Sequence, residues 1–119
     1  MSTLAVGTIK SISSAAPVFQ NTSGTEIGQL VFAWVTVDPS GSSSVADSFN
    51  ISSVTEIDNH SWTINFARAA SNSDYATAVD VQADTRITTN TRTTSNFRAD
   101  TGSDLTSSSQ RFFIIVCGD

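Results

Sequence analysis

Apolar and polar residues alternate along most of this chain with the period of two that is typical of β-strands. Helical spacing is almost absent, because the alanine-rich stretch 66–83 is broken by the turn-prone Ser71-Asn72-Ser73-Asp74. Strands are therefore predicted over 4–9, 29–37, 48–57, 61–68, 75–82, 91–99 and 111–117. Short strands at this spacing predict an all-β fold, an antiparallel β-sandwich or jelly-roll-like single domain.

Two turns support this division. Asp38-Pro39-Ser40-Gly41 ends the strong strand 29–37 with residues that favour a β-turn. Asp58-Asn59-His60 separates two strands closely enough to form a hairpin. In the second arm of that hairpin, Trp62, Ile64 and Phe66 share one face, which predicts a sheet with one face in the core and one in water.

Two strands are apolar on both faces. The strand 29–37 carries Leu30, Phe32 and Trp34 on one face and valines on the other, and 111–117 has the same character. Such strands must be covered on both sides. The cover could be the N-terminal segment, a further layer of the same chain, or another subunit. We favour an oligomer interface, because a chain of 119 residues has little left for a third layer. The side chains assigned to it are Val31, Val35, Val37, Phe112, Ile114 and Val116.

The first 28 residues differ in composition from the rest. They are rich in Ser, Thr, Gly and Ala, and they include Pro17 and the turn-prone Asn21-Thr22-Ser23-Gly24. We expect an extended N-terminal arm or a short strand pair over 1–28, serving as an attachment segment, and a β-sandwich body over 29–119. An arm could add a strand to a neighbouring molecule. An ordinary first strand followed by a loop is the alternative.

Charge narrows the range of partners. The formal net charge is −5, with eleven acidic residues against six basic ones, and the basic residues are not clustered. Nucleic-acid binding is therefore not expected. Charged residues make up 14% of the chain, whereas Ser and Thr supply 36 of the 119 residues, so hydroxyls rather than ions are expected to wet the surface. We expect no signal peptide and no membrane contact, since no apolar run approaches the length of a membrane helix.

Residues that could carry catalysis are few, and we expect no enzyme activity and no cofactor. His60 is the only histidine, and beside Asp58 in a hairpin loop it is a weak candidate for a Ser–His–Asp relay. Cys117 lies among large apolar residues, where burial is expected to keep the thiol inert. Asp100 and Asp104 bracket a glycine turn that weakly suggests a calcium loop, but its closing glutamate is missing. No metal site is expected.

Aromatic and basic side chains suggest binding. Trp34, Trp62 and Tyr75 could stack on sugars, although aromatics at strand spacing are more often core residues. Arg92 and Arg98 fall on one face of the predicted strand 91–99. Arginine suits buried or interfacial pairing, and the partners could be Asp80, Asp84 or Asp100.

Several strings resemble a β-rich module of structural proteins in tailed bacteriophages, particularly marine and cyanobacterial ones. They are Ala33-Trp34-Val35, Ser48-Phe49-Asn50-Ile51-Ser52-Ser53-Val54, Trp62-Thr63-Ile64-Asn65-Phe66 and Asn72-Ser73-Asp74-Tyr75-Ala76. The resemblance covers residues 18–118. The chain departs from it at the hairpin, where His60 replaces a glycine, and at Trp62, where the module has tyrosine.

The resemblance implies a non-enzymatic part of the virion surface, made in the host cytoplasm and commonly assembled as a homotrimer. Its partners would be phage capsid or tail proteins. Because the chain is short and has no long fibre shaft, we favour a capsid decoration or cement protein. The alternative is a tail fibre or receptor-binding tip that contacts a host surface glycan.

Overall fold

The computed structural model describes residues 5–9, 19–28, 30–40, 44–83, 85–106 and 110–118 and divides the chain into two compact units, Met1–Leu30 and Val31–Asp119. In the first unit, β1 (Phe19–Gln20) and β2 (Glu26–Gly28) form a small antiparallel hairpin. Its turn is held by the Asn21 side chain, whose Oδ1 accepts hydrogen bonds from the backbone N–H groups of Ser23 and Thr25 at 3.0 and 2.9 Å. The role of 1–28 in attachment stays a prediction.

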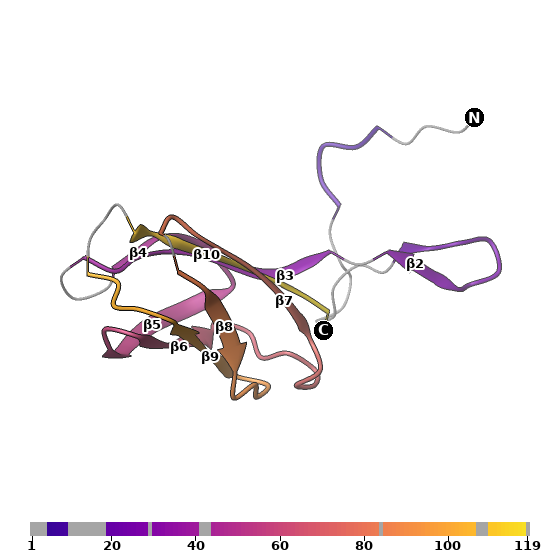
Figure 1. Ribbon diagram of the computed structural model, residues 1–119. Coiled ribbons are helices and arrows are strands. Elements are labelled where there is room, and N and C mark those ends of the chain that lie inside the picture. The colour runs from indigo at the N-terminus through magenta and orange to yellow at the C-terminus, as the bar shows by residue number, and fades with distance from the viewer. Residues whose placement is uncertain are drawn as a thin grey trace. The chain divides into compact units, whose positions relative to one another are not determined.

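The second unit is a sandwich of two four-stranded antiparallel sheets, which lie face to face (Figure 1). One sheet has the order β4-β3-β10-β7, with β3 (Val31–Asp38), β4 (Ser44–Phe49), β7 (Ala76–Val81) and β10 (Phe112–Cys117). The other has the order β5-β6-β9-β8, with β5 (Ile51–Asp58), β6 (Ser61–Phe66), β8 (Ile87–Asn90) and β9 (Asn96–Thr101). The predicted antiparallel β-sandwich is confirmed.

The core fills the space between the two inner faces and is rich in aromatic rings. Phe66 is at its centre, with ring centroids 5.0 Å from Phe32, 5.5 Å from Tyr75 and 5.7 Å from Phe97. The buried Tyr75 hydroxyl donates to the carbonyls of the 91–96 connection, so its polar end is satisfied. The predicted inward face of β6 is confirmed, since its three apolar side chains are buried.

The side chains assigned to an oligomer interface lie elsewhere than predicted. Five of the six, Val35, Val37, Phe112, Ile114 and Val116, are at most 2% exposed and face the second sheet of the same chain. The interface assignment is therefore wrong for these five, because alternation shows that a strand has two apolar faces but not which of them meets the other sheet. Val31 alone, 43% exposed, stays accessible.

Strand boundaries differ from the predicted ones mainly at the sheet edges. Residues 5–9 form no strand, and the predicted strand 91–99 begins only at Asn96. Two strands of the sandwich are additional, β4 and β8, and both lie at sheet edges. Their sequences, SVADSF and ITTN, show weak alternation because an edge strand has less apolar surface to bury.

Asn50 makes the corner at which the chain passes from one sheet to the other. It lies between β4 and β5 with a φ of 56°, in the left-handed region that Asn tolerates better than other side chains. Its Oδ1 accepts a 2.8 Å hydrogen bond from the Arg68 backbone N–H, and its Nδ2 donates to the Phe32 carbonyl at 3.2 Å. The side chain thus ties β3 and the end of β6 to the corner.

Asn50→Ala is expected to lower the free energy of unfolding by about 2–4 kcal/mol, because it removes these hydrogen bonds and strains the left-handed backbone. Asn50→Gly removes the same hydrogen bonds without the strain, so it should cost less. Urea denaturation followed by tryptophan fluorescence measures both. Equal losses for the two variants would show that the backbone conformation contributes nothing.

Candidate interaction surface

The outward face of the β4-β3-β10-β7 sheet carries apolar side chains that cross all four strands. Phe49 of β4 lies directly opposite Trp34 of β3. Trp34 in turn lies opposite Ile115 of β10, which lies opposite Ala78 of β7. Directly opposite residues of antiparallel strands point to the same side of the sheet and touch. We call these four residues the apolar row.

The apolar row is open to solvent. Phe49 is 54% and Ile115 44% exposed, and Trp34 is half-buried between them. Phe113 and Cys117, which flank Ile115 on the same side of β10, are half-buried and exposed. A contiguous apolar patch on an otherwise hydroxyl-rich protein is typical of an interaction site. Both faces of β3 and β10 were predicted to be covered. The other sheet covers the inward face, whereas side chains of the outward face are exposed.

Acidic residues border the apolar row at both edges of the sheet. In the adjacent row, Asp47 of β4 and Asp80 of β7 flank Thr36 and Phe113. Both carboxylates belong to exposed residues. The backbones of β4 and β7 at these two aspartates are three strand spacings apart, a distance of about 14 Å. None of the strand positions that point outward from this sheet is Lys or Arg.

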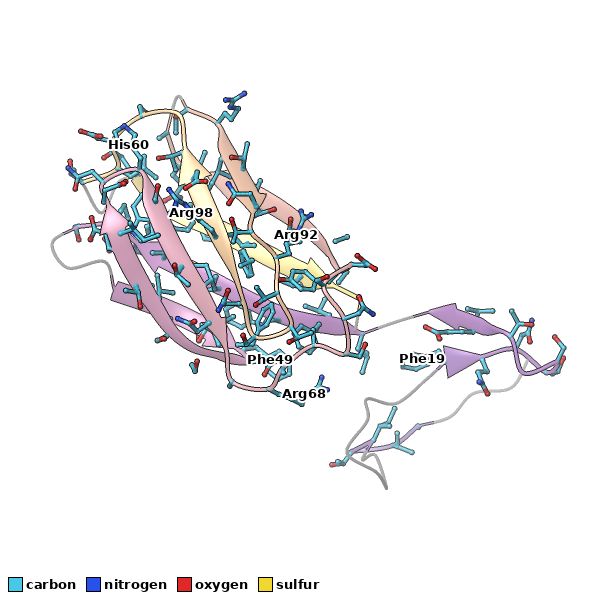
Figure 2. All side chains as sticks on the ribbon, turned by 90° about the horizontal axis from the view of Figure 1, so that it is seen from below. Phe19, Phe49, His60, Arg68, Arg92 and Arg98 are labelled. Carbon is cyan, nitrogen blue, oxygen red and sulfur yellow. The ribbon has the colours of Figure 1, made fainter. Side chains whose placement is uncertain are left out.

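The paired outward positions of the β5-β6-β9-β8 sheet are polar, and the exposed Ile57 lies at a bulge of edge strand β5. Thr63 and Asn65 of β6 point outward, and Asn65 Nδ2 donates to Ser53 Oγ on β5 at 3.0 Å. The other paired positions on this side of the sheet include Thr55, Asn96, Arg98, Asp100, Asn90 and Thr88. Figure 2 views the body from this side and labels Arg98 on it. The two outer faces of the sandwich therefore offer different chemistry, one apolar and acidic, the other hydroxyl- and amide-rich.

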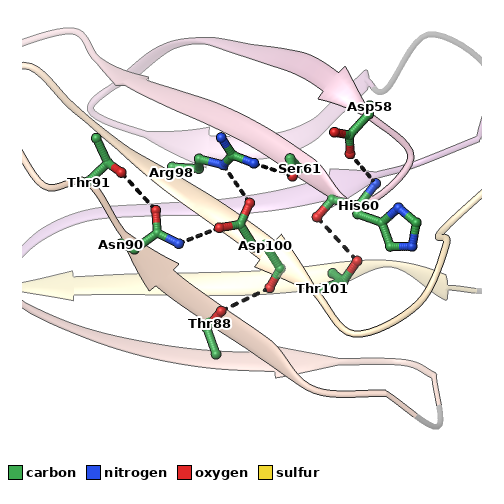
Figure 3. A network of polar contacts seen from close by, with 9 residues as sticks. All are labelled: Asp58, His60, Ser61, Thr88, Asn90, Thr91, Arg98, Asp100 and Thr101. Carbon is green, nitrogen blue, oxygen red and sulfur yellow. Dashed lines mark hydrogen bonds and ion pairs between the residues drawn. The ribbon is translucent and has the colours of Figure 1, made fainter.

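Arg98 and Asp100 form the best-connected polar cluster on that polar face (Figure 3). Arg98 Nε donates to Asp100 Oδ1 at 2.6 Å, and its Nη2 donates to Ser61 Oγ at 2.7 Å. Asn90 Nδ2 donates to the other oxygen of Asp100. The predicted pairing of an arginine with Asp100 is confirmed, whereas Arg92 donates to Thr77 and Thr89. Because its members satisfy one another, this cluster serves to join β6, β8 and β9.

Asp100 carries a shifted pKa. Burial acts to raise the pKa of this carboxyl, but the hydrogen bonds from Arg98, Asn90 and Ser61 together outweigh it and hold the pKa below its usual value. A carboxyl whose pKa is lower in the folded state adds stability above its unfolded pKa of about 4. That stability is lost as the pH falls through the folded pKa.

Asp100→Asn is therefore expected to lower the free energy of unfolding at pH 7 and to flatten its decline below pH about 4. Arg98→Met should flatten the same part of the profile, since it removes the cation that stabilises the carboxylate. Urea unfolding at a series of pH values measures this. An unchanged acid limb in Asp100→Asn would contradict the role given to the cluster. Some acid sensitivity will remain in both variants, because they keep Asp38. Hydrogen bonds from Ser40 and Arg111 lower the pKa of this second carboxyl.

The candidate catalytic residues are not brought together for catalysis. His60 Nε2 lies 2.8 Å from Asp104 Oδ1, and Asp58 Oδ1 accepts from the His60 backbone N–H instead of the ring. Asp104 and Asp100 thus have separate partners and do not converge as a calcium loop would require. Within the described ranges, no group of three or more His, Cys, Asp or Glu could hold a metal ion.

Cys117 and the aromatic side chains named as possible sugar-stacking residues divide between the core and the surface. Cys117 is exposed on the outward face of β10, so its predicted burial is wrong; the alternation of β10 turns residues 113, 115 and 117 away from the core. Trp62 and Tyr75 are core residues and cannot stack on sugars. Trp34 and Phe49 are the aromatic residues that reach the surface row. The sequence of edge strand β4 alternates only weakly, so the sequence does not predict this strand or the row that Phe49 forms with Trp34.

No protein-family model, no curated protein sequence and no solved structure matches this chain. Among the residues that the structure describes, no helix is long and apolar enough to cross a membrane.

Proposed function

We propose that this chain is a non-enzymatic structural protein of a bacteriophage virion, a decoration or cement protein on the particle surface. The resemblance of residues 18–118 to modules of tailed-phage structural proteins supports this. The supporting structural observation is the apolar row, a solvent-exposed apolar strip that crosses a whole sheet. A protein that attaches to a larger assembly needs such a surface. After synthesis in the host cytoplasm the protein would join the particle.

Immunogold electron microscopy of purified particles tests the proposal. Antibodies raised against the full chain should label the head, and mass spectrometry of the same particles should find the protein. Label confined to the tail would favour the tail-fibre alternative. Absence of the protein from washed particles would contradict the proposal altogether.

The protein is expected to be a homotrimer, as the resemblance implies. A trimer uses a head-to-tail contact in which two different patches of the chain meet. Size-exclusion chromatography with multi-angle light scattering at micromolar concentration should give three times the mass of the 12.6 kDa chain. A stable monomer under these conditions would contradict the expected trimer and leave the surface location untouched.

One observation favours the alternative, a receptor-binding tip that contacts a host glycan. The exposed Phe49 ring and Trp34 lie side by side on a sheet face, beside the carboxylate of Asp47. Aromatic rings next to polar groups are suited to stacking on sugars. A glycan array with the full chain tests this; binding that is lost in Trp34→Ala would support the alternative.

A further inference from the structure

The apolar row has a charge pattern that restricts what can cover it. Asp47 and Asp80 stand in the row beside it, one on each edge strand, about 14 Å apart. The basic residues of the described chain are engaged or placed elsewhere. Arg98 and Arg111 pair with aspartates, and Arg92 donates to threonines. Arg111 is next to this face, immediately before β10, but it is already paired with Asp38 at the end of β3. Among the described residues, no unpaired cation of this sheet therefore offsets the two carboxylates.

The remaining basic residues change nothing on this face. The Arg68 guanidinium lies 4.9 Å from the centroid of the Phe32 ring, at the end of β3, and Arg86 immediately precedes β8 of the other sheet. Lys10 lies outside the described residues. A binding partner must therefore supply its own positive charge to balance Asp47 and Asp80 once water is removed.

A second copy of the chain fits this face poorly. In a two-fold dimer with its axis along the strands, β4 of one copy lies over β7 of the other, which places Asp47 against the partner copy's Asp80. With the axis across the strands, the carboxylates lie over apolar side chains or over one another. Both arrangements remove like charges or unpaired carboxylates from water, which is unfavourable. A head-to-tail trimer does not require this contact, so it leaves the face available.

From this pattern we infer that the apolar row docks on another protein, whose surface presents an apolar strip bordered on both sides by Lys or Arg. This inference rests on the proposed function, since a capsid or tail protein would carry that surface. The apolar strip would cover Phe49, Trp34 and Ile115, and the cations would pair with Asp47 and Asp80. Charge pairs at the rim of an apolar contact set orientation and exclude wrong partners.

Cys117 provides the assay. Its thiol is exposed on the same side of β10 as Ile115, and it is the chain's one cysteine. The probes are two amphipathic helical peptides, one of Leu and Lys, the other with Glu in place of every Lys. The readout is the rate at which Cys117 of the full chain reacts with a thiol reagent, Ellman's reagent, as peptide is added.

The Leu/Lys peptide is expected to slow the reaction of Cys117 and the Leu/Glu peptide to leave it unchanged. Asp47→Asn combined with Asp80→Asn should raise the Leu/Lys concentration for half-protection at least about 10-fold. The matched control is Asp58→Asn with Asp104→Asn, which changes the net charge equally in two connections outside the apolar row. It should shift the Leu/Lys concentration for half-protection by less than about 2-fold.

Several results would overturn the inference. They are equal protection by both peptides, protection by neither, or an equal shift in both double variants. Protection that grows with the concentration of the wild-type chain alone would assign the face to a second copy. Protection by a cello-oligosaccharide would assign it to a glycan. The proposed function can fail separately. A chain that is missing from particles but prefers the Leu/Lys peptide would contradict the proposed function alone. A particle-bound chain whose Cys117 still reacts would contradict only the inference that the apolar row is the docking surface.

Discussion

Ile114→Asn is expected to abolish cooperative folding of the sandwich. Ile114 is 1% exposed and points from the central strand β10 into the core. The substitution removes a buried apolar side chain, which costs about 2–5 kcal/mol, and leaves an amide without partners, which costs about 1–3 kcal/mol more. Since a domain is stable by only about 5–15 kcal/mol, little stability would remain. Near-ultraviolet circular dichroism and urea denaturation measure the loss.

Ile114→Val is the control for this prediction. It keeps the side chain apolar and should cost about 0.5–1.5 kcal/mol with an unchanged denaturant slope. The contrary result is an Ile114→Asn variant that folds cooperatively and fails only in assembly. It would show that Ile114 lies at an oligomer interface, as the sequence predicted, and not in the core.

The sandwich itself could be predicted because its central strands must be apolar. β3 and β10 are flanked by strands on both sides, and their runs of large apolar residues predict buried strands directly. Edge strands carry a weaker signal. β8 has the sequence ITTN with one buried residue, Ile87, so its alternation barely differs from that of a threonine-rich loop.

The interaction surface could be predicted only in part. Alternation showed that β10 has two apolar faces, and both occur in the structure. Deciding which face meets the other sheet requires the pairing partners of each residue, which are set by register across strands far apart in sequence. Trp34 pairs with Phe49 and Ile115, 15 and 81 positions away in the chain. The same long-range register brings Arg98 to Ser61.

Ile115→Asn tests the outward face of the same strand. Ile115 is 44% exposed and lies near the middle of the apolar row, between Trp34 and Ala78. The change leaves net charge unaltered and removes no core residue, so the protein should stay folded, within about 1 kcal/mol of the wild type. Attachment to particles should fall at least about 30-fold, because a central apolar residue of an interface contributes about 2 kcal/mol or more.

Re-addition to particles that lack the protein measures attachment, with bound protein quantified after sedimentation. Thr63→Asn is the matched control, since Thr63 points outward from a central strand of the polar face. It should attach like the wild type. The same substitution at positions 114 and 115 compares the two sides of a single strand. Loss of folding in Ile114→Asn and loss of attachment in Ile115→Asn would assign the core to the inward face and the partner to the apolar row. Normal attachment of Ile115→Asn would place the binding surface elsewhere on the chain.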